Sequence, residues 1–385
     1  MARSIRAVKT ATPSAWASPM SVRYSYLPQQ FADIDDLWAD LKAFVATGDF
    51  TLGKPLAQFE RSFADLIGTR HAIGVNSGTD AIKLSLKAVG VGHGDDVITA
   101  ANTFVATVGA ISETGARPVF VDVDDTFCMN VDQVAAAITS RTKAIVPVHF
   151  TGYMTDMVKL SPIAKRHALP IVEDACQSIL GAIDDKNAGT WGSTGCFSLH
   201  PLKNLNVWSD GGVIVTDDDR LADLLRLLRN HGLSGRDEVA LLGYNSRLDT
   251  IQAVVGNWLI PRTLAIALKR VANAAYYDQH LGRIWQIRIP PRPANMRCVY
   301  HLYVVFAEHR DELLTHCQRA GIECKVHYPI PIYRQPAVAH LGYRSGDFPV
   351  TDRHAAEIIT FPVDQHLTRE QQDYVIETVK AFYSK

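Results

Sequence analysis

The stretch Ile171-Val172-Glu173-Asp174-Ala175-Cys176-Gln177 begins as an apolar run and ends in polar residues. It follows Leu169-Pro170, so the pattern predicts a short buried strand that ends near Asp174. Open α/β sheets bind their ligands beyond the carboxyl ends of the parallel strands. Asp174 is therefore expected at the edge of a binding site.

Lys203 lies 29 residues after Asp174, within the segment Cys196-Phe197-Ser198-Leu199-His200-Pro201-Leu202-Lys203-Asn204. Pyridoxal phosphate needs an amine that can form a Schiff base, a carboxylate that keeps the pyridine nitrogen protonated, and donors around its phosphate. Lys203, Asp174 and Ser198 could supply one each. The alternative is an ordinary exposed lysine beside a turn, as most lysines are. The strand-end position of Asp174 favours the cofactor site.

The composition is that of a globular protein without a dominant charge. The chain has 385 residues, 47% of them hydrophobic and 21% charged, enough for a large domain and a smaller partner domain. Its 39 Lys and Arg nearly balance its 40 Asp and Glu, so we expect neither nucleic acid nor a membrane as a partner. The apolar runs are also too short to predict a membrane span.

Six cysteines are scattered along the chain without a Cys-x-x-Cys pair. This usage is typical of reduced thiols and predicts a cytoplasmic protein. A zinc site from Cys176, Cys196, His149 and His200 is an alternative, but these residues lack the spacing of zinc ligands. We therefore expect no bound metal.

The beginning of the chain differs in composition from the rest. Met1 to Ala32 contain four basic residues and no Asp or Glu. That composition resembles a transit peptide, but Pro13, Pro19 and Pro28 interrupt any amphipathic helix. We therefore expect a flexible extension over residues 1–30, with Met20 as an alternative start.

From Phe31 onward, apolar strand patterns alternate with helical patterns. This alternation predicts an α/β fold with a mostly parallel sheet and helices on both faces. We expect a large domain over residues 31–255, and a linker helix with a smaller α+β domain over residues 256–385. Within this pattern no Gly-x-Gly-x-x-Gly fingerprint follows a strand, which argues against a dinucleotide fold.

A candidate anion site follows the expected strand His71–Val75. The next residues, Asn76-Ser77-Gly78-Thr79-Asp80, precede a helix expected from Ala81. A hydroxyl cap, a glycine and the positive end of the helix dipole together suit a phosphate, and Ser198 could add a second hydroxyl. The alternative is a plain capped helix with nothing bound.

Six motifs, in order along the chain, resemble those of the DegT/StrS-type sugar aminotransferases. They are Ser77-Gly78-Thr79-Asp80-Ala81, Thr103-Phe104-Val105-Ala106-Thr107, Glu173-Asp174-Ala175-Cys176-Gln177, Ser198 with Lys203-Asn204-Leu205, Asp210-Gly211-Gly212, and Gly243-Tyr244-Asn245-Ser246-Arg247-Leu248-Asp249. The resemblance runs from about Phe31 to the C-terminus. It implies a type I aminotransferase fold with a seven-stranded-type sheet, pyridoxal 5'-phosphate as cofactor, and a homodimer with active sites at the subunit interface.

The resemblance also implies a role for each matching residue. Lys203 would be the Schiff-base lysine, Asp174 the partner of the pyridine nitrogen, and Gln177 a neighbour of the ring hydroxyl. Phe104 would stack on the ring, although a lone aromatic at a strand end is more often a core residue. The phosphate would be held by Ser77, Gly78, Thr79 and Ser198 of one subunit and by Asn245 of the other.

The substrate side is less determined by the sequence. By family likeness, glutamate is the expected amino donor, and Arg247 and Arg334 are candidates for its carboxylate or for structural ion pairs. His327, Tyr328 and Tyr333 lie in a segment that resembles the border of the substrate pocket, where many relatives have histidine in place of Tyr333. A buried His-Tyr pair that packs for structure is the alternative.

Trp208 departs from the family pattern, which has a small, glycine-rich stretch between the lysine and the Gly-Gly strand. A tryptophan at this position is expected to occupy space near the cofactor mouth, which makes Trp208 a candidate substrate contact. Residues 200–208 look most like the branch that forms 8-amino-3,8-dideoxy-manno-octulosonate, so an oxidised 3-deoxy-octulosonate (Kdo-type) acid is the preferred oxo-sugar. This would place the enzyme in cell-surface polysaccharide biosynthesis, such as that of lipopolysaccharide, or in secondary metabolism. The alternatives are a nucleotide-linked (UDP-, dTDP- or GDP-) ketohexose as substrate, or a non-catalytic regulatory protein on the same fold. A related dehydratase would carry histidine in place of Lys203.

Overall fold

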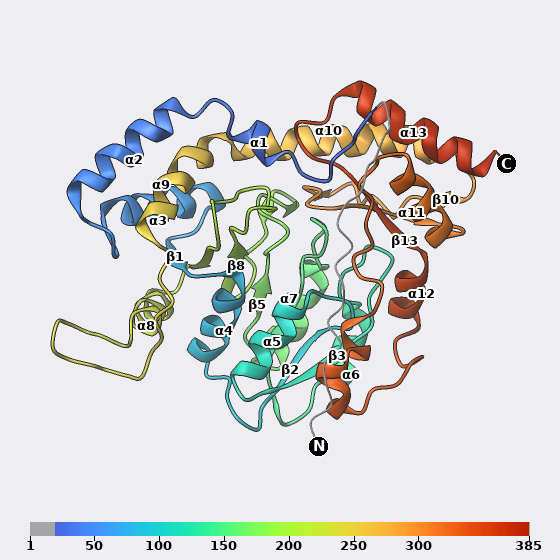
Figure 1. Cartoon of the computed structure of the whole chain (residues 1–385). Helices are drawn as coiled ribbons and strands as arrows, with labels where there is room; N and C mark the ends of the chain where they lie inside the picture. Colours follow the sequence, from blue (N-terminus) through green and yellow to red (C-terminus); the bar gives the residue numbers. More distant parts are fainter. Residues whose placement is uncertain (1–19, 385) are drawn as a thin grey trace, which may run out of the picture.

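A seven-stranded sheet forms the centre of the larger domain in the computed structural model, which describes residues 20–384 (Figure 1). Its strand order is β1-β9-β8-β5-β4-β2-β3, because parallel bridges Ile145–Ile171 and Val148–Asp174 join a four-stranded and a three-stranded ladder. β9 runs antiparallel to β1 and β8, and the other pairings are parallel. The mostly parallel sheet and the type I aminotransferase fold are thus confirmed. The strands are β1 (His71–Val75), β2 (Asp96–Ala100), β3 (Arg117–Val121), β4 (Thr142–Val146), β5 (Val172–Asp174), β8 (Thr194–Ser198) and β9 (Gly212–Thr216).

Helices cover both faces of this sheet. Side chains alternate along the strands, so that Val213 and Val215 of β9 pack with α2, α3, α7 and α9, whereas Ile214 packs with α4, α5 and α8. Burial on both faces explains why the strands are apolar throughout instead of alternating. The helices are α2 (Asp35–Thr47), α3 (Lys54–Ile67), α4 (Gly78–Ala88), α5 (Val105–Glu113), α6 (Val134–Ala137) with η1 (Val131–Gln133), α7 (Met157–Arg166), α8 (Asp219–Arg229) and α9 (Thr250–Leu259).

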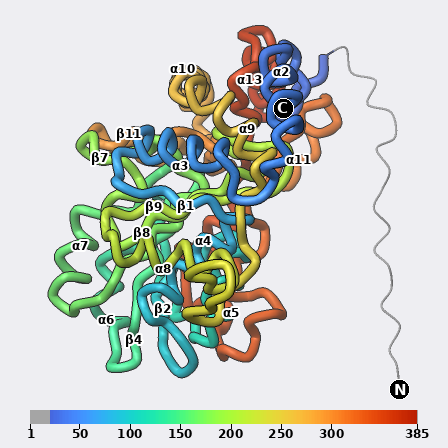
Figure 2. The backbone as a smooth tube through the Cα atoms, turned by 90° about the vertical axis from the view of Figure 1, so that its left-hand side faces the viewer, coloured from blue at the N-terminus to red at the C-terminus, as the bar shows by residue number. Residues whose placement is uncertain are grey.

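A smaller domain packs around the antiparallel sheet β10-β12-β13, and its helices α10 and α13 lie at one end of the molecule in both views (Figures 1 and 2). The linker helix α10 joins the two cores, since Ala267 packs in the first and Ala274 in the second. The elements are η2 (Ile260–Arg262), α10 (Thr263–Leu281), β10 (Ile287–Arg288), β12 (Tyr303–Ala307), α11 (Arg310–Arg319), η3 (Ile332–Arg334), η4 (Pro336–Leu341), α12 (Pro349–Glu357), β13 (Ile358–Phe361) and α13 (Arg369–Tyr383). A further small sheet, β11 (Met296–Arg297), β6 (Ala182–Ile183) and β7 (Lys186–Asn187), connects the domains.

The predicted flexible extension over residues 1–30 needs correction. Residues 1–19 lie outside the described residues, but Val22 is fully buried and lies in parallel register with Ile322. Its N–H donates to the Gly321 carbonyl at 3.0 Å, and its carbonyl accepts from the Glu323 N–H at 2.9 Å. Tyr26 is also buried, just before the short helix α1 (Leu27–Gln30). The alternating apolar residues of this segment bind a strand-like edge about 300 residues further along the chain, which no local pattern announces.

The helical run Thr250–Leu281 is long and apolar enough to cross a membrane by length and composition alone, with a mean hydropathy of 1.3. However, 56% of its most apolar window is buried within the protein. A core helix of a globular protein passes the same test, so the run carries no argument for a membrane.

Candidate active site

A cavity of about 330 Å³ opens at the carboxyl end of β5. Four segments of the large domain meet there: the start of α4, the start of α5, the end of β5 and the loop after β8. Most of the residues proposed from the sequence line this one cavity: Ser77, Gly78, Thr79, Phe104, Asp174, Gln177, Ser198, Lys203, His327 and Tyr328. The topology therefore brings together side chains that are up to 251 positions apart.

The start of α4 has the geometry of a phosphate site. Ser77 caps the helix, with its Oγ accepting a hydrogen bond of 3.1 Å from the Asp80 N–H. A Cβ atom on Gly78 would lie 2.8 Å from the Cβ of Ser198 and 2.9 Å from the Sγ of Cys176. Only glycine allows the helix to begin so close to the end of β8. The first free amides of α4 and the positive end of its dipole thus border the cavity.

Asp174 is held as an acceptor at the end of β5. Its Oδ2 accepts a hydrogen bond of 2.7 Å from the Thr107 hydroxyl, and its Oδ1 accepts one of 3.2 Å from the Cys176 N–H. Thr103 pairs with Thr107 at 2.7 Å and extends the chain of hydroxyls. Only 6% of Asp174 is exposed, so its carboxylate is shielded yet still lines the cavity.

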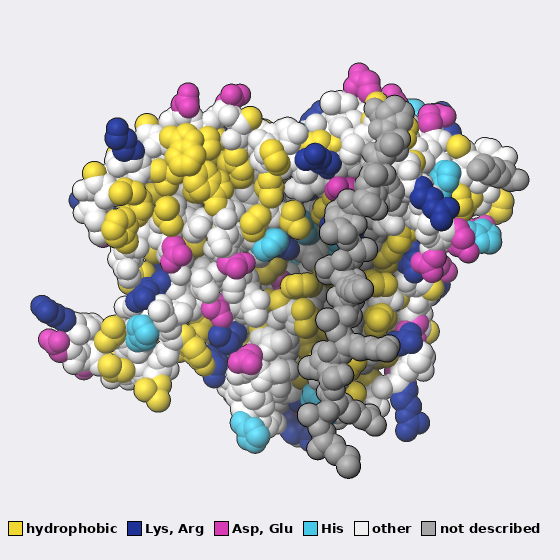
Figure 3. Space-filling view, in the orientation of Figure 1, with side chains coloured by type: hydrophobic (Ala, Val, Ile, Leu, Met, Phe, Trp, Pro, Cys, Tyr) yellow, Lys and Arg dark blue, Asp and Glu magenta, His cyan; other side chains and the backbone are white. Residues whose placement is uncertain are grey.

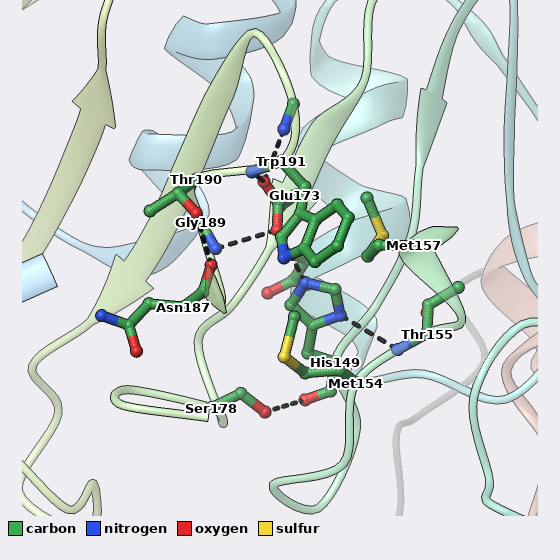
Figure 4. A network of polar contacts seen from close by, with 12 residues as sticks. His149, Met154, Thr155, Met157, Glu173, Ser178, Asn187, Gly189, Thr190 and Trp191 are labelled. Carbon is green, nitrogen blue, oxygen red and sulfur yellow. Dashed lines mark hydrogen bonds and ion pairs between the residues drawn. The ribbon is translucent and has the colours of Figure 1, made fainter. Parts of the chain in front are cut away.

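A second polar network surrounds Glu173, the residue before Asp174, and fixes the backbone there (Figure 4). The fully buried Glu173 accepts hydrogen bonds from the backbone N–H groups of Gly189, Trp191 and Gly192, at 2.7–2.8 Å, and contacts Nε2 of His149 at 2.9 Å. Nδ1 of His149 accepts from the Thr155 N–H at 3.2 Å, so the imidazole proton lies on Nε2, facing Glu173. The sequence suggested His149 only as an alternative zinc ligand, and it did not suggest that Glu173 and His149 pair.

Lys203 reaches the same cavity from the loop after β8. Burial lowers the pKa of its amine below the ordinary lysine value, opposed by the nearby Cys176 and Asp174. The loop itself is fixed, because the Asn206 side-chain amide donates to the Lys203 carbonyl at 3.0 Å and that of Asn204 donates to the Val299 carbonyl at 2.9 Å. A larger fraction of uncharged amine is what a nucleophilic lysine requires.

The opposite wall comes from the N-terminal segment and the smaller domain. Tyr24, His301 and Lys325 line it together with His327 and Tyr328. Tyr24 stacks on the His327 ring with centroids 5.9 Å apart, and Nζ of Lys325 lies 4.0 Å from the centroid of Tyr24. Burial, with smaller effects of Lys325 and Lys203, lowers the pKa of His327 to about 4.

Two predicted cofactor contacts need closer description. Phe104 lines the cavity half-exposed, 6.0 Å from the ring of Tyr328, so it is available for stacking. Gln177 also lines it, but its Oε1 already accepts a hydrogen bond of 2.7 Å from the Thr151 N–H. Its NH₂ group can donate to a ring hydroxyl, and Oε1 keeps one lone pair that can accept from it.

Three of the residues proposed for the substrate lie elsewhere in their own subunit. Tyr333 is 2% exposed and donates a hydrogen bond of 2.6 Å to Asp352, and Arg334 pairs with the same carboxylate at 3.6 Å. Both lie on η3, which packs its apolar side chains beside β3. Arg247 donates to the Asn230 side chain at 3.0 Å. Within one subunit, local ion pairs, hydrogen bonds and packing hold these three side chains outside the cavity, and their contact with the substrate stays a prediction.

Trp208 also points away from the cavity. Its ring centroid lies 5.9 Å from that of Phe31 and 5.5 Å from that of Trp38, and its backbone N–H donates to the Gln252 side chain at 2.9 Å. Trp208 therefore packs against α2 and does not narrow the cofactor mouth of its own subunit, which corrects the prediction.

Asn245 lies at the base of a loop that follows α8 and extends from the body of the protein (Figure 1). It is exposed, and it does not line the cavity of its own subunit. Its predicted contact with the neighbouring subunit's cofactor stays a prediction.

The described residues fit pyridoxal phosphate. The amine of Lys203, the carboxylate of Asp174 and the α4 N-terminus border one cavity, and Gly78 keeps that helix close enough for backbone contacts. Among residues 20–384, in contrast, no group of three or more His, Cys, Asp or Glu side chains is placed to hold a metal ion. The four residues considered as zinc ligands form no such group: Nε2 of His149 contacts Glu173, and Sγ of Cys196 contacts the Ser85 hydroxyl.

Comparison with known proteins agrees with this geometry. Residues 33–380 match the DegT/DnrJ/EryC1/StrS aminotransferase family. The chain is 39% identical to a dTDP-3-amino-3,4,6-trideoxy-alpha-D-glucose transaminase of Micromonospora megalomicea, over 93% of this chain and 97% of that one. It is also 39% identical to a pleiotropic regulatory protein of Geobacillus stearothermophilus, over 94% and 99%.

A solved structure gives the same result at the level of the fold and the cofactor. NtdA of Bacillus subtilis, with bound cofactor PMP, superposes with a TM-score of 0.89 at 30% identity, covering 95% of this chain and 86% of that one. The chain therefore belongs to the DegT/DnrJ/EryC1/StrS aminotransferase family and is a pyridoxal phosphate-dependent sugar aminotransferase.

Proposed function

We propose that this protein moves an amino group from glutamate to the keto group of a nucleotide-linked sugar. The observation that carries the proposal is the convergence of Lys203, Asp174 and the α4 N-terminus on one cavity. The relative from Micromonospora, named for a dTDP-sugar, supports the nucleotide-linked substrate. The six free thiols, five of them buried, support a cytoplasmic site of action.

The residues divide the work between proton transfer and orientation. When bound, pyridoxal phosphate supplies an electron-withdrawing ring that stabilises charge on the carbon that loses its proton. Asp174 holds the proton on the ring nitrogen, and the amine of Lys203 carries a proton from one carbon to the other. The α4 N-terminus and Ser198 fix the phosphate and hence the orientation of the ring.

A homodimer that shares its active sites is part of the proposal. Hydrophobic side chains gather over α2 and the residues after it on one face (Figure 3), where Trp38, Val45 and Phe50 are each 55% exposed. The loop after α8 carries Leu242 at 92% exposure as well as Asn245. Large exposed apolar groups of this kind suit an interface with a second copy.

The dimer has a direct test. Lys203→Ala and Asn245→Ala homodimers should each be nearly inactive, whereas an exchanged mixture should recover about a quarter of the wild-type rate. Half of the dimers in the mixture would be heterodimers. In each heterodimer, one of the two sites would combine the intact Lys203 of one subunit with the intact Asn245 of the other, so a quarter of all sites would be complete. If the mixture gained nothing although mass spectrometry showed exchanged subunits, Asn245 would not act in the partner's site.

The Kdo-type sugar acid remains the second candidate, to be decided by the substrate assay. Its sequence argument depended on residues 200–208, of which Trp208 packs against Phe31 and Trp38. The assay compares UDP-, dTDP- and GDP-linked ketohexoses with an oxidised 3-deoxy-octulosonate, and measures 2-oxoglutarate formed from glutamate. Turnover of the sugar acid alone would refute the nucleotide-linked substrate, and Lys203→Ala serves as the blank.

The same assay tests the regulatory alternative, which the name of the Geobacillus relative raises. A regulatory protein would need neither the amine of Lys203 nor the carboxylate of Asp174. Both side chains line the cavity, which favours catalysis. If the purified protein binds pyridoxal phosphate but gives no 2-oxoglutarate with any donor or sugar in the panel, catalysis is refuted.

A further inference from the structure

A histidine that the sequence did not single out lies next to the proposed catalytic amine. Nε2 of His301 lies 3.5 Å from Nζ of Lys203, and the two side chains line the same cavity. Nδ1 of His301 is buried and has no hydrogen-bond partner among the described residues. The imidazole is therefore not committed to a structural pair, unlike that of His149.

The backbone around His301 is fixed from several directions. Arg270 of α10 donates to the carbonyls of Tyr300 and His301 at 3.2 and 3.4 Å, and pairs with Asp364 at 3.5 Å. Tyr300 has a positive φ of 46°, which is rare for a bulky residue. Strain of this kind persists only where the surroundings hold the chain, and it is found mostly at functional sites.

The histidine segment is also tied directly to the lysine loop. The Asn204 side chain, next to Lys203, donates to the Val299 carbonyl at 2.9 Å. On the C-terminal side of His301, the backbone N–H of Leu302 donates to the Thr151 carbonyl at 3.0 Å. The two backbone segments that carry Lys203 and His301 are thus held together by contacts that do not depend on either side chain.

The surroundings keep the imidazole of His301 neutral. Burial lowers its pKa well below the usual value, and the positive charges of Lys203 and Arg270 add to that shift, followed by His327 and His200. A neutral imidazole has one nitrogen that accepts and one that donates. A proton on Nδ1 would leave Nε2 free to accept from Lys203. A cavity of about 10 Å³, about the size that one water molecule needs, is lined by His301, Tyr24 and Arg270 and gives Nδ1–H room for a partner.

We propose that His301 is a positioning residue for Lys203: its Nε2 accepts an N–H of the free lysine amine and so directs the amine's lone pair toward the reacting carbon. In the reaction, the Lys203 amine would take a proton from the donor's α carbon, become an ammonium group, and return the proton to the cofactor's C4' carbon, which keeps the amino group. The imidazole accepts a hydrogen bond throughout and gains or loses no proton. The inference rests on the proposed role of Lys203, but not on which sugar is the substrate.

Two variants separate the hydrogen bond from the shape of the side chain. His301→Phe keeps a ring but has no acceptor, whereas His301→Gln retains one. In single turnover with glutamate, followed by loss of the visible cofactor band, we expect His301→Phe to be about 10–100-fold slower, since a misdirected group costs rates of this order. Its deuterium isotope effect with α-deuterated glutamate should rise, and His301→Gln should recover most of the rate. An unchanged rate and isotope effect in His301→Phe would refute the proposal.

A spectroscopic measurement on the apoprotein tests the same point without catalysis. In ¹⁵N NMR of histidine-labelled protein, His301 should be neutral with its proton on Nδ1, and the Nε2 signal should move in Lys203→Met. A proton on Nε2 would exclude acceptance from Lys203 and overturn the inference, even if His301→Phe did not fold.

His354 provides a matched control, because it is fully buried and its Nδ1 also lacks a partner among the described residues, yet it does not line the cavity. His354→Gln should change thermal stability but not the rate of the glutamate half-reaction. Lys203→Ala distinguishes a failure of the proposed role of Lys203 from a failure of the proposed role of His301. If it kept the visible band, the role of Lys203 would fail. If it lost the band while His301→Phe reacted normally, only the role of His301 would fail.

Discussion

Glu173 and Asp174 are adjacent acids for which the structure predicts opposite mutational outcomes. Glu173 is fully buried; its Oε1 accepts from the N–H groups of Trp191 and Gly192, and its Oε2 accepts from Gly189 and contacts His149. In Glu173→Gln, one oxygen becomes an NH₂ group that faces two donors. His149 cannot relieve this by moving its proton to Nδ1, because Nδ1 already accepts from the Thr155 N–H, and two donors would then face each other there.

Every arrangement of the glutamine therefore leaves two buried donors without acceptors. Each costs about 1–3 kcal/mol, so Glu173→Gln should lose about 2–6 kcal/mol, a large part of the 5–15 kcal/mol that holds a typical protein folded. For a chain of this length, that lowers the melting temperature by about 2–7 °C. The assay is a thermal melt of the apoprotein followed by circular dichroism.

Asp174→Asn should behave differently. The asparagine oxygen can accept from the Cys176 N–H, and its NH₂ group can donate to the Thr107 hydroxyl, which rotates to accept. The melting temperature of the apoprotein should stay within about 1 °C, because no buried donor loses its acceptor. Transamination should fall by at least about 100-fold, since an amide cannot keep the ring nitrogen protonated. A melting temperature of Glu173→Gln equal to that of the wild type, or an equal loss in both variants, would refute the stabilising role of the Glu173 carboxylate.

Three further outcomes follow from the structure. Gly78→Ala should weaken pyridoxal phosphate binding by about tenfold or more in a visible titration, because the new Cβ would lie under 3 Å from Ser198 and Cys176. Gly109→Ala is the control and should bind the cofactor normally, because its Cβ would meet nothing within 4 Å. Tyr333→Phe removes the hydrogen bond to Asp352, so it should cost about 1 kcal/mol in urea denaturation and leave KM for both substrates unchanged; a raised KM would return Tyr333 to the substrate site. Burial lowers the pKa of His354 from 6.5 to about 4, so on acidification the unfolded state takes up this proton before the folded state does, and the free energy of unfolding falls as the pH drops from about 6.5 to 4. In His354→Gln, the slope of this free energy against pH should be smaller by up to about 1.4 kcal/mol per pH unit. A slope equal to that of the wild type would contradict the lowered pKa.

The cofactor side of the site could be predicted from the sequence because its signals are local. A strand that ends in an acid, a capped helix start after Ser77 and a lysine near a Gly-Gly strand each belong to one short segment. The parallel sheet then aligns the strand ends, so local motifs become neighbours in space. The two-sided burial of the strands was also visible, as continuous apolar runs.

The opposite wall could not be predicted in this way. Tyr24 is placed by the pairing of Val22 with Ile322, 300 residues further along the chain, and the segment of His301 is held by Thr151 and Asn204, which lie about 150 and 100 residues before it. Trp208 shows the converse error, since it is only five positions from Lys203 and yet packs against α2. Nearness along the chain does not decide nearness in space within a loop: Trp208 packs outside the cavity, whereas Asp210, two residues further on, lines it.

The two walls of the cavity come from separate parts of the chain. One wall belongs to the large domain and carries Asp174 and Lys203, whereas the other is built from residues 20–26 and from residues after 299. Grafting those two segments from a relative with a different sugar should therefore exchange the substrate while keeping the cofactor chemistry. It also means that the N-terminal segment has to be grafted together with its partner around Ile322, since each holds the other in place.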